Sequence, residues 1–149
     1  MNRYLKKGLL LLVIVVVALS CNRVKTTPEV KATYADGKPK IVEEYITDNN
    51  GKKTLYRETH YFPGEKKYIS GTYDNKQLRN GVWTSWYENG QKNSEQNYIN
   101  GKENGLYNVW HPNGNQYIKG EYKMGKEVGN WIFYDNLGNI IKKMDFGEE

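Results

Sequence analysis

Residues 81–90 have the sequence GVWTSWYENG, residues 105–114 have GLYNVWHPNG, and residues 129–138 have GNWIFYDNLG. The three stretches begin 24 residues apart, and each contains a first glycine, an aromatic residue two positions later and a glycine at its end. A fixed period of this size is typical of modular repeats, in which each short unit buries its apolar side chains against its neighbours. The sequence therefore predicts an array of repeats rather than a fold built around an enzyme pocket.

Turn-forming dipeptides divide the rest of the chain into short segments. They are Asp36-Gly37, Asn50-Gly51, Asn80-Gly81, Asn89-Gly90, Asn100-Gly101, Asn104-Gly105 and Asn113-Gly114. Such dipeptides accept the positive φ angles that tight hairpins require, and aromatic or β-branched residues fill the segments between them. We expect nine strands, near residues 39–46, 53–62, 66–73, 82–88, 91–99, 106–111, 115–123, 130–135 and 139–146. Strands joined by tight turns predict an all-β fold, an elongated antiparallel meander of tandem 24-residue β-hairpin repeats.

Two aromatic residues in the first half of each unit lie three positions apart, as Trp83 and Trp86 do. Strict pleating places such residues on opposite faces of a sheet. Either both faces carry rings, or a bulge at Thr84-Ser85 turns both rings to one side. The spacing recurs in all three units and defines an aromatic ladder of candidate binding residues: Trp83, Trp86, Tyr107, Trp110, Trp131 and Tyr134.

These units resemble MORN repeats, and more closely the bacterial variant found in YwqK-like antitoxin proteins, whose pattern is G-x-W-x-x-Y-x-x-N-G followed by a return strand ending Y-x-x-G. The pattern is matched by Gly81, Trp83, Trp86, Asn89, Gly90, Tyr98 and Gly101, by Gly105, Tyr107, Trp110, Asn113, Gly114, Tyr122 and Gly125, and by Gly129, Trp131, Tyr134 and Gly138. The resemblance implies the repeat fold, and it implies scaffolds for protein or lipid contact rather than one defined function.

The N-terminus has the pattern of an export signal. Arg3, Lys6 and Lys7 precede an uncharged run from residue 8 to residue 19, which is shorter than the roughly 20 residues that a membrane-spanning helix needs. Small residues then lead into Cys21, the only cysteine, in an arrangement that resembles a bacterial lipobox. We expect lipidation at Cys21 and a bacterial cell-envelope lipoprotein held in the outer or inner membrane; a cleaved secreted protein and an uncleaved anchor are the alternatives.

The expected organisation has four parts: a signal peptide over residues 1–20, the lipidated cysteine and a tether over 21–33, degenerate N-terminal repeats over 34–73, and three MORN-variant repeats over 74–149. The formal net charge of +5 depends largely on the signal, because removing Arg3, Lys6 and Lys7 leaves 19 basic against 17 acidic residues. The remaining charges of both signs are interleaved, which argues against a nucleic-acid partner.

No catalytic or metal-binding motif stands out. The two histidines, His60 and His111, occupy strand positions that vary between units, and residues 48–51 form a turn signal too short for an EF-hand loop. The sequence lacks a phosphate-binding Gly-Lys-Ser/Thr loop and a glycine-flanked nucleophilic serine. We therefore expect a protein that is not an enzyme and that needs no cofactor or metal.

Two classes of function remain open. In the first, the repeats form a membrane-tethered scaffold whose rings contact a protein partner or a second copy, with toxin neutralisation as a variant that the resemblance implies. In the second, the aromatic ladder binds a cell-surface glycan or a cationic headgroup. The two classes differ in ring exposure, because a glycan platform needs solvent-exposed rings in a row and a protein site needs a contiguous apolar patch.

Overall fold

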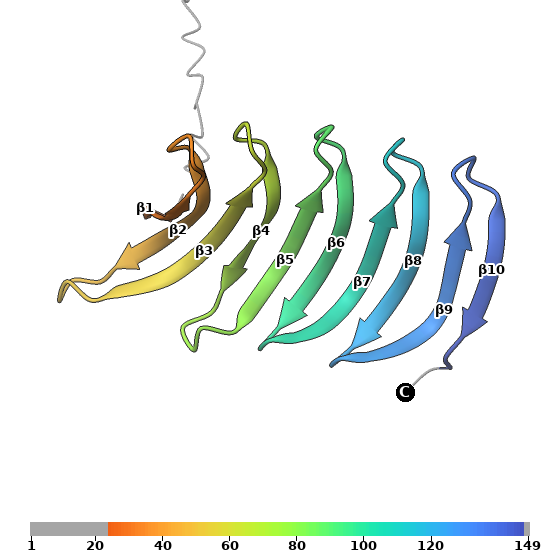
Figure 1. Ribbon diagram of the computed structural model, residues 1–149. Coiled ribbons are helices and arrows are strands. Elements are labelled where there is room, and N and C mark those ends of the chain that lie inside the picture. The colour runs from red at the N-terminus through yellow and green to blue at the C-terminus, as the bar shows by residue number, and fades with distance from the viewer. Residues whose placement is uncertain (1–23, 148–149) are drawn as a thin grey trace, which may run out of the picture.

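The computed structural model describes residues 24–147, which form one antiparallel sheet of ten strands arranged in sequence order (Figure 1). The strands are β1 (Thr27–Thr33), β2 (Pro39–Thr47), β3 (Lys53–Tyr61), β4 (Lys67–Tyr73), β5 (Arg79–Trp86), β6 (Lys92–Ile99), β7 (Lys102–Trp110), β8 (Gln116–Lys123), β9 (Lys126–Tyr134) and β10 (Ile140–Asp145). The predicted all-β meander of hairpins is confirmed.

The sheet is a single layer. Within the described residues the secondary structure is entirely strand and turn, so neither a helix nor a second sheet covers a face (Figure 1). The buried hydrophobic side chains of this part of the chain are Trp83, Val128 and Trp131. A single layer buries little apolar surface per residue, and therefore most side chains on both faces remain partly exposed to solvent.

Two kinds of turn join the strands. Turns of five residues line one end of the sheet, at residues 34–38, 62–66, 87–91, 111–115 and 135–139, and in each the first residue accepts and donates backbone hydrogen bonds across the turn. At the other end, the last two turns are the two-residue pairs Asn100-Gly101 and Met124-Gly125. Both residues of each pair have positive φ, 51° and 80° in the first and 51° and 89° in the second. Positive φ at both positions is the geometry of a type I′ hairpin, whose twist matches that of the flanking strands.

Two of the expected turn dipeptides do not form turns. Asn80-Gly81 lies inside β5 and Asn104-Gly105 lies inside β7. At each site three residues of the strand oppose one residue of the preceding strand, and the same irregularity recurs in β9 at Gly129. All three glycines have positive φ, which an irregularity of this kind requires. β5, β7 and β9 therefore begin three to four residues earlier than predicted.

Part of the expected tether is a strand in the structure. Residues 27–33, placed in the tether by their proline and their lack of periodicity, form the edge strand β1, which pairs with β2 through Glu29–Glu43 and Val30–Val42. Pro28 is tolerated because an edge strand leaves half of its N–H groups without a strand partner. The expected signal peptide and Cys21 lie outside the described residues. Among residues 24–147, no helix is long and apolar enough to cross a membrane.

Candidate binding surfaces

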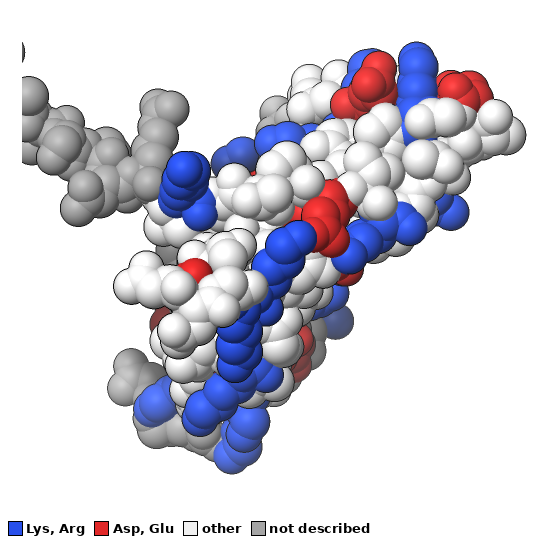
Figure 2. Space-filling model, turned by 90° about the vertical axis from the view of Figure 1, so that its left-hand side faces the viewer, with Lys and Arg blue, Asp and Glu red and all other residues white. Residues whose placement is uncertain are grey.

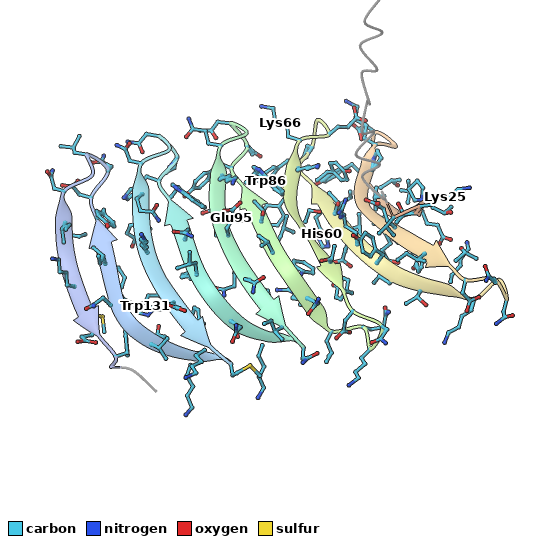
Figure 3. All side chains as sticks on the ribbon, turned by 180° about the vertical axis from the view of Figure 1, so that it is seen from behind. Lys25, His60, Lys66, Trp86, Glu95 and Trp131 are labelled. Carbon is cyan, nitrogen blue, oxygen red and sulfur yellow. The ribbon has the colours of Figure 1, made fainter. Side chains whose placement is uncertain are left out.

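The ladder residues Trp83 and Trp86 lie on opposite faces of the sheet. Trp83 pairs with Gln96 and Trp86 pairs with Lys92. The register shifts between Ser85 and Trp86, and the extra residue lies on β6. β5 therefore has no bulge at Thr84-Ser85. Alternation along β5 therefore continues unbroken, and both faces carry rings. We call the face with Trp83, Tyr107 and Trp131 the aromatic face, and the face with Trp86, Trp110 and Tyr134 the opposite face. Figure 3 labels one ring of each face, Trp131 of the aromatic face and Trp86 of the opposite face.

Most ring pairs on the aromatic face pack edge to face, and the Trp131–Tyr107 pair is tilted. Trp131 contacts Tyr107, Tyr122 and Phe146, with ring centroids 5.6, 5.1 and 6.0 Å apart. Trp83 contacts Tyr73 at 5.3 Å and Tyr98 at 6.5 Å. These separations lie in the range where aromatic pairs stabilise a protein beyond the area that they bury. The second-half rings of the repeat, Tyr98, Tyr122 and Phe146, thus belong to the same packed layer as the ladder rings.

Each ladder tryptophan on the aromatic face lies over a glycine of the preceding strand. A Cβ atom added to Gly71 would overlap the ring of Trp83, and one added to Gly120 would overlap the ring of Trp131. In the middle unit Gln96 takes the glycine position and the smaller ring of Tyr107 takes the tryptophan position. Ring size and the residue beneath it therefore vary together. No turn signal or motif marks Gly71 and Gly120 in the sequence, although each lies two positions before a tyrosine of the return strand.

Burial on the aromatic face separates the ladder residues. Trp83 is 4% exposed and Trp131 is 3% exposed, so both rings belong to the core. Tyr107 is half-buried, and burial raises the pKa of its hydroxyl; burial also raises the pKa of Tyr122, with a smaller contribution from the charge of Glu127. Because these rings cover one another, the aromatic face does not present a flat row of exposed rings to a polymer.

The opposite face presents a different row. Trp86, Trp110 and Tyr134 are half-buried, and lysines lie over the two tryptophans: Lys67 Nζ is 5.8 Å from the Trp86 ring centre, and Lys92 Nζ is 5.7 Å from that of Trp110. Cations at such distances are attracted by the ring face. Exposed aliphatic side chains accompany this row: Val82 at 54%, Leu106 at 57% and Ile140 at 51% exposure.

Side chains at the five-residue turns link neighbouring units. The Tyr87 hydroxyl donates to the carbonyl of Trp110 at 2.8 Å, and Asn89 Nδ2 donates to the carbonyl of Pro112 at 2.8 Å. The next unit repeats both contacts, with His111 Nε2 3.0 Å from the Tyr134 carbonyl and Asn113 Nδ2 2.7 Å from that of Asn136. His111 therefore contacts the neighbouring unit from the first residue of a turn, and not from the strand position expected for it.

The N-terminal strands carry carboxylates where the later strands carry rings. Glu29, Glu43 and Glu58 are direct cross-strand partners on β1, β2 and β3. Hydrogen bonds from Lys31 and Lys53 lower the pKa of Glu29 to about 2. Figure 2, viewed from this end of the sheet, shows basic side chains running in a strip with acidic side chains beside them. Among the described residues, no group of three His, Cys, Asp or Glu side chains could hold a metal ion.

Comparison with known proteins gives no relative: neither a protein-family model nor a curated protein matches this chain. The geometry itself defines the class of protein, a single-layer antiparallel β-repeat protein with two chemically distinct faces.

Proposed function

We propose that this protein is a membrane-anchored bacterial lipoprotein, without enzymatic activity, whose MORN-like repeats serve as a scaffold for a protein partner. The observation that carries the proposal is the exposed apolar row on the opposite face of a sheet that no second layer covers. Val82 and Leu106 occupy equivalent positions of two neighbouring units, and Ile140 pairs with Tyr134 at the end of the sheet. Exposed apolar groups of this kind are a cost to solubility in a free monomer, and a partner surface removes that cost.

The apolar row consists of Val82, Leu106 and Ile140 together with Trp86, Trp110 and Tyr134. The aliphatic members are more than half exposed, and the rings beside them offer large area with few rotatable bonds. The lysines over the rings place positive charge at the rim of the row. Charge at a rim helps to orient an approaching partner and adds little to the binding affinity. This arrangement fits a protein surface better than it fits a stacking platform for sugars.

The position of β1 supports a scaffold that acts close to the bilayer. Five residues separate Cys21 from Thr27, and a fully extended chain of this length spans roughly 20 Å. If Cys21 carries the lipid, the sheet begins within that distance of the membrane, about half of what a tether to residue 33 would allow. A partner at the same membrane would then meet a surface held at high local concentration.

A crosslinked pull-down from native membranes tests the proposal. We expect a Val82→Asp/Leu106→Asp double variant to lose a partner that the wild-type protein captures, because two charges replace exposed apolar contacts. Val30→Asp is the matched control, since Val30 is 54% exposed on the same face but lies on β1, away from the row. Circular dichroism establishes that all three proteins fold.

A partner retained by the double variant would contradict the proposed surface, and so would wild-type protein that captures nothing. Sedimentation of the purified protein identifies self-association, in which the partner is a second copy. Identification of a captured partner as a toxin would give the antitoxin variant of the proposal.

A further inference from the structure

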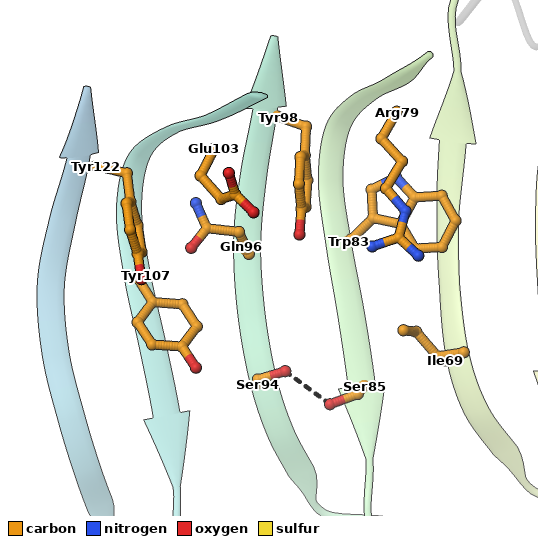
Figure 4. Close-up of a pocket in the computed structure, with 10 residues that line it drawn as sticks. All are labelled: Ile69, Arg79, Trp83, Ser85, Ser94, Gln96, Tyr98, Glu103, Tyr107 and Tyr122. Atoms are coloured by element: carbon orange, nitrogen blue, oxygen red, sulfur yellow. Dashed lines mark hydrogen bonds between the residues drawn. The ribbon is translucent and has the colours of Figure 1, made fainter. Parts of the chain in front are cut away.

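A hollow of about 260 Å³ interrupts the packed rings of the aromatic face (Figure 4). It lies over β5 and β6, where Ser85 and Ser94 are direct cross-strand partners and share a hydrogen bond of 2.7 Å. Their neighbours along the same row are larger, Ile69 on β4 and Val109 on β7. Two small side chains between two large ones leave the hollow.

Aromatic rings and charged groups surround these serines. Trp83 and Tyr98 stand on one side and Tyr107 on the other (Figure 4). Arg79 lies against the side formed by Trp83 and Tyr98. Its guanidinium carbon is 4.0 Å from the Trp83 ring centre and 5.5 Å from the Tyr98 ring centre. Glu103, the cross-strand partner of Tyr98, completes the lining. The two charged groups have opposite signs, so the hollow carries no net charge from them.

The floor contains an unsatisfied polar atom. Gln96 is 6% exposed, and its Nε2 donates to the carbonyl of Asn97 at 2.9 Å. Its Oε1 is buried and has no hydrogen-bond partner among the described residues. A buried acceptor without a partner costs about 1–3 kcal/mol, so the packing beneath the hollow is not optimised for stability alone.

We propose that this hollow, the serine cleft, binds a single hexose-sized sugar unit. Its volume suits a group of that size. A pyranose ring offers apolar C–H faces to aromatic walls and carries hydroxyls that both donate and accept hydrogen bonds. Glu103 accepts, Arg79 donates, and the serine hydroxyls do both. A simple cation would be repelled by the positive charge of Arg79, and an apolar ligand would leave these polar groups without hydrogen-bond partners.

This inference is independent of the partner surface, because the cleft and the apolar row lie on opposite faces of the sheet. It also differs from a stacking ladder, since the cleft takes one sugar between two walls and not a chain laid across a row of rings. In the C-terminal units the same row carries larger paired residues, Ile118 and Phe133, in place of two serines.

Methyl glycosides of glucose, galactose, mannose and N-acetylglucosamine are suitable probes, with binding followed by saturation-transfer NMR and by tryptophan fluorescence. We expect at least one probe to bind the full chain with a dissociation constant on the order of 1 mM. Ser94→Val should weaken that binding by at least about tenfold, because it fills the hollow with the side chain that Val109 already places in the same row.

Glu103→Gln keeps the size of the side chain and removes its charge, and we expect it to weaken binding by about tenfold without a volume change. Thr84→Val is the control, because Thr84 neighbours Ser85 in β5 but faces the other side, and binding should be unchanged. Absence of binding by every probe at tens of millimolar overturns the proposal. Equal binding by wild type, Ser94→Val and Glu103→Gln overturns it as well.

Discussion

The two halves of the sheet fill equivalent positions with opposite chemistry. On the aromatic face, Glu58 pairs with Gly71 across β3 and β4 just as Trp83 pairs with Gln96 across β5 and β6. Continued toward the N-terminus, the same row contains Glu43 and Glu29; continued toward the C-terminus, it contains Tyr107 and Trp131. Hairpins of similar geometry therefore form with either a carboxylate or an aromatic ring at this position.

The difference separates what shapes the sheet from what stabilises it. Turns and strand pairing recur in both halves, so backbone geometry sets the fold. In the N-terminal half, exposed ion pairs such as Lys31–Glu29 at 2.9 Å hold the row, and such pairs contribute little. In the C-terminal half, buried rings contribute much more. We infer that the N-terminal strands open at lower free energy than β5 to β10.

The largest expected effect comes from removing a core ring. Trp131→Ala should lower the free energy of unfolding by about 3–5 kcal/mol, because it deletes a nearly fully buried side chain with three ring contacts. Glu58→Ala, at the equivalent N-terminal position, should cost less than about 1 kcal/mol. Urea denaturation of both variants makes the comparison. Equal losses would remove the proposed difference between the halves.

A smaller effect tests the fit between each ring and the residue beneath it. Tyr107→Trp alone should cost about 1–3 kcal/mol, because Gln96 occupies the space that Gly71 and Gly120 leave free in the neighbouring units. Adding Gln96→Gly should restore most of that loss. A double-mutant cycle measures the coupling between the two positions. Additive effects would show that the ring and the residue beneath it are independent.

The repeat period and the hairpins were predictable from the sequence, because spaced glycines and aromatics mark both directly. The bulges at Asn80-Gly81 and Asn104-Gly105 were mistaken for turns, since positive φ is needed in either structure and the dipeptide does not distinguish them. β1 was missed because edge pairing depends on β2 and not on the composition of residues 27–33.

Candidate site residues were harder to predict. All six ladder rings lie on the sheet, yet the sequence could not tell that Trp83 and Trp131 are covered by neighbouring rings. The exposed members of the apolar row, Val82 and Leu106, have no motif and become visible only through their exposure. The serine cleft depends on which residues are paired across β5 and β6, which a periodic pattern leaves undefined.

A comparison of the two I′ turns predicts a modest gain. Met124 has φ of 51°, a conformation that most side chains disfavour, whereas Asn100 occupies the equivalent position with a residue that tolerates it. Met124→Asn should raise the free energy of unfolding by about 0.5–1 kcal/mol. Thermal denaturation checks this, and an unchanged or lowered midpoint would contradict it.

The smallest effect concerns the N-terminal carboxylates. Hydrogen bonds from Lys31 and Lys53 hold the pKa of Glu29 near 2, below its ordinary value of 4.5, so its contribution to stability is present above pH 4.5 and is lost as the pH falls toward 2. Because Glu29 is exposed, this contribution is slight. NMR titration should give a higher pKa for Glu29 in Lys53→Met than in wild type; identical titration curves would show that Lys53 has no influence.

The most direct test of the proposed scaffold places a photo-crosslinking residue at single positions of the protein in native membranes. Position 106 lies in the apolar row on β7, and position 30 lies on the same face at the N-terminal edge with similar exposure. We predict a discrete crosslinked species from position 106 and none from position 30. Crosslinks of equal yield from both positions, or none from position 106, would contradict a partner surface on the C-terminal half of the opposite face.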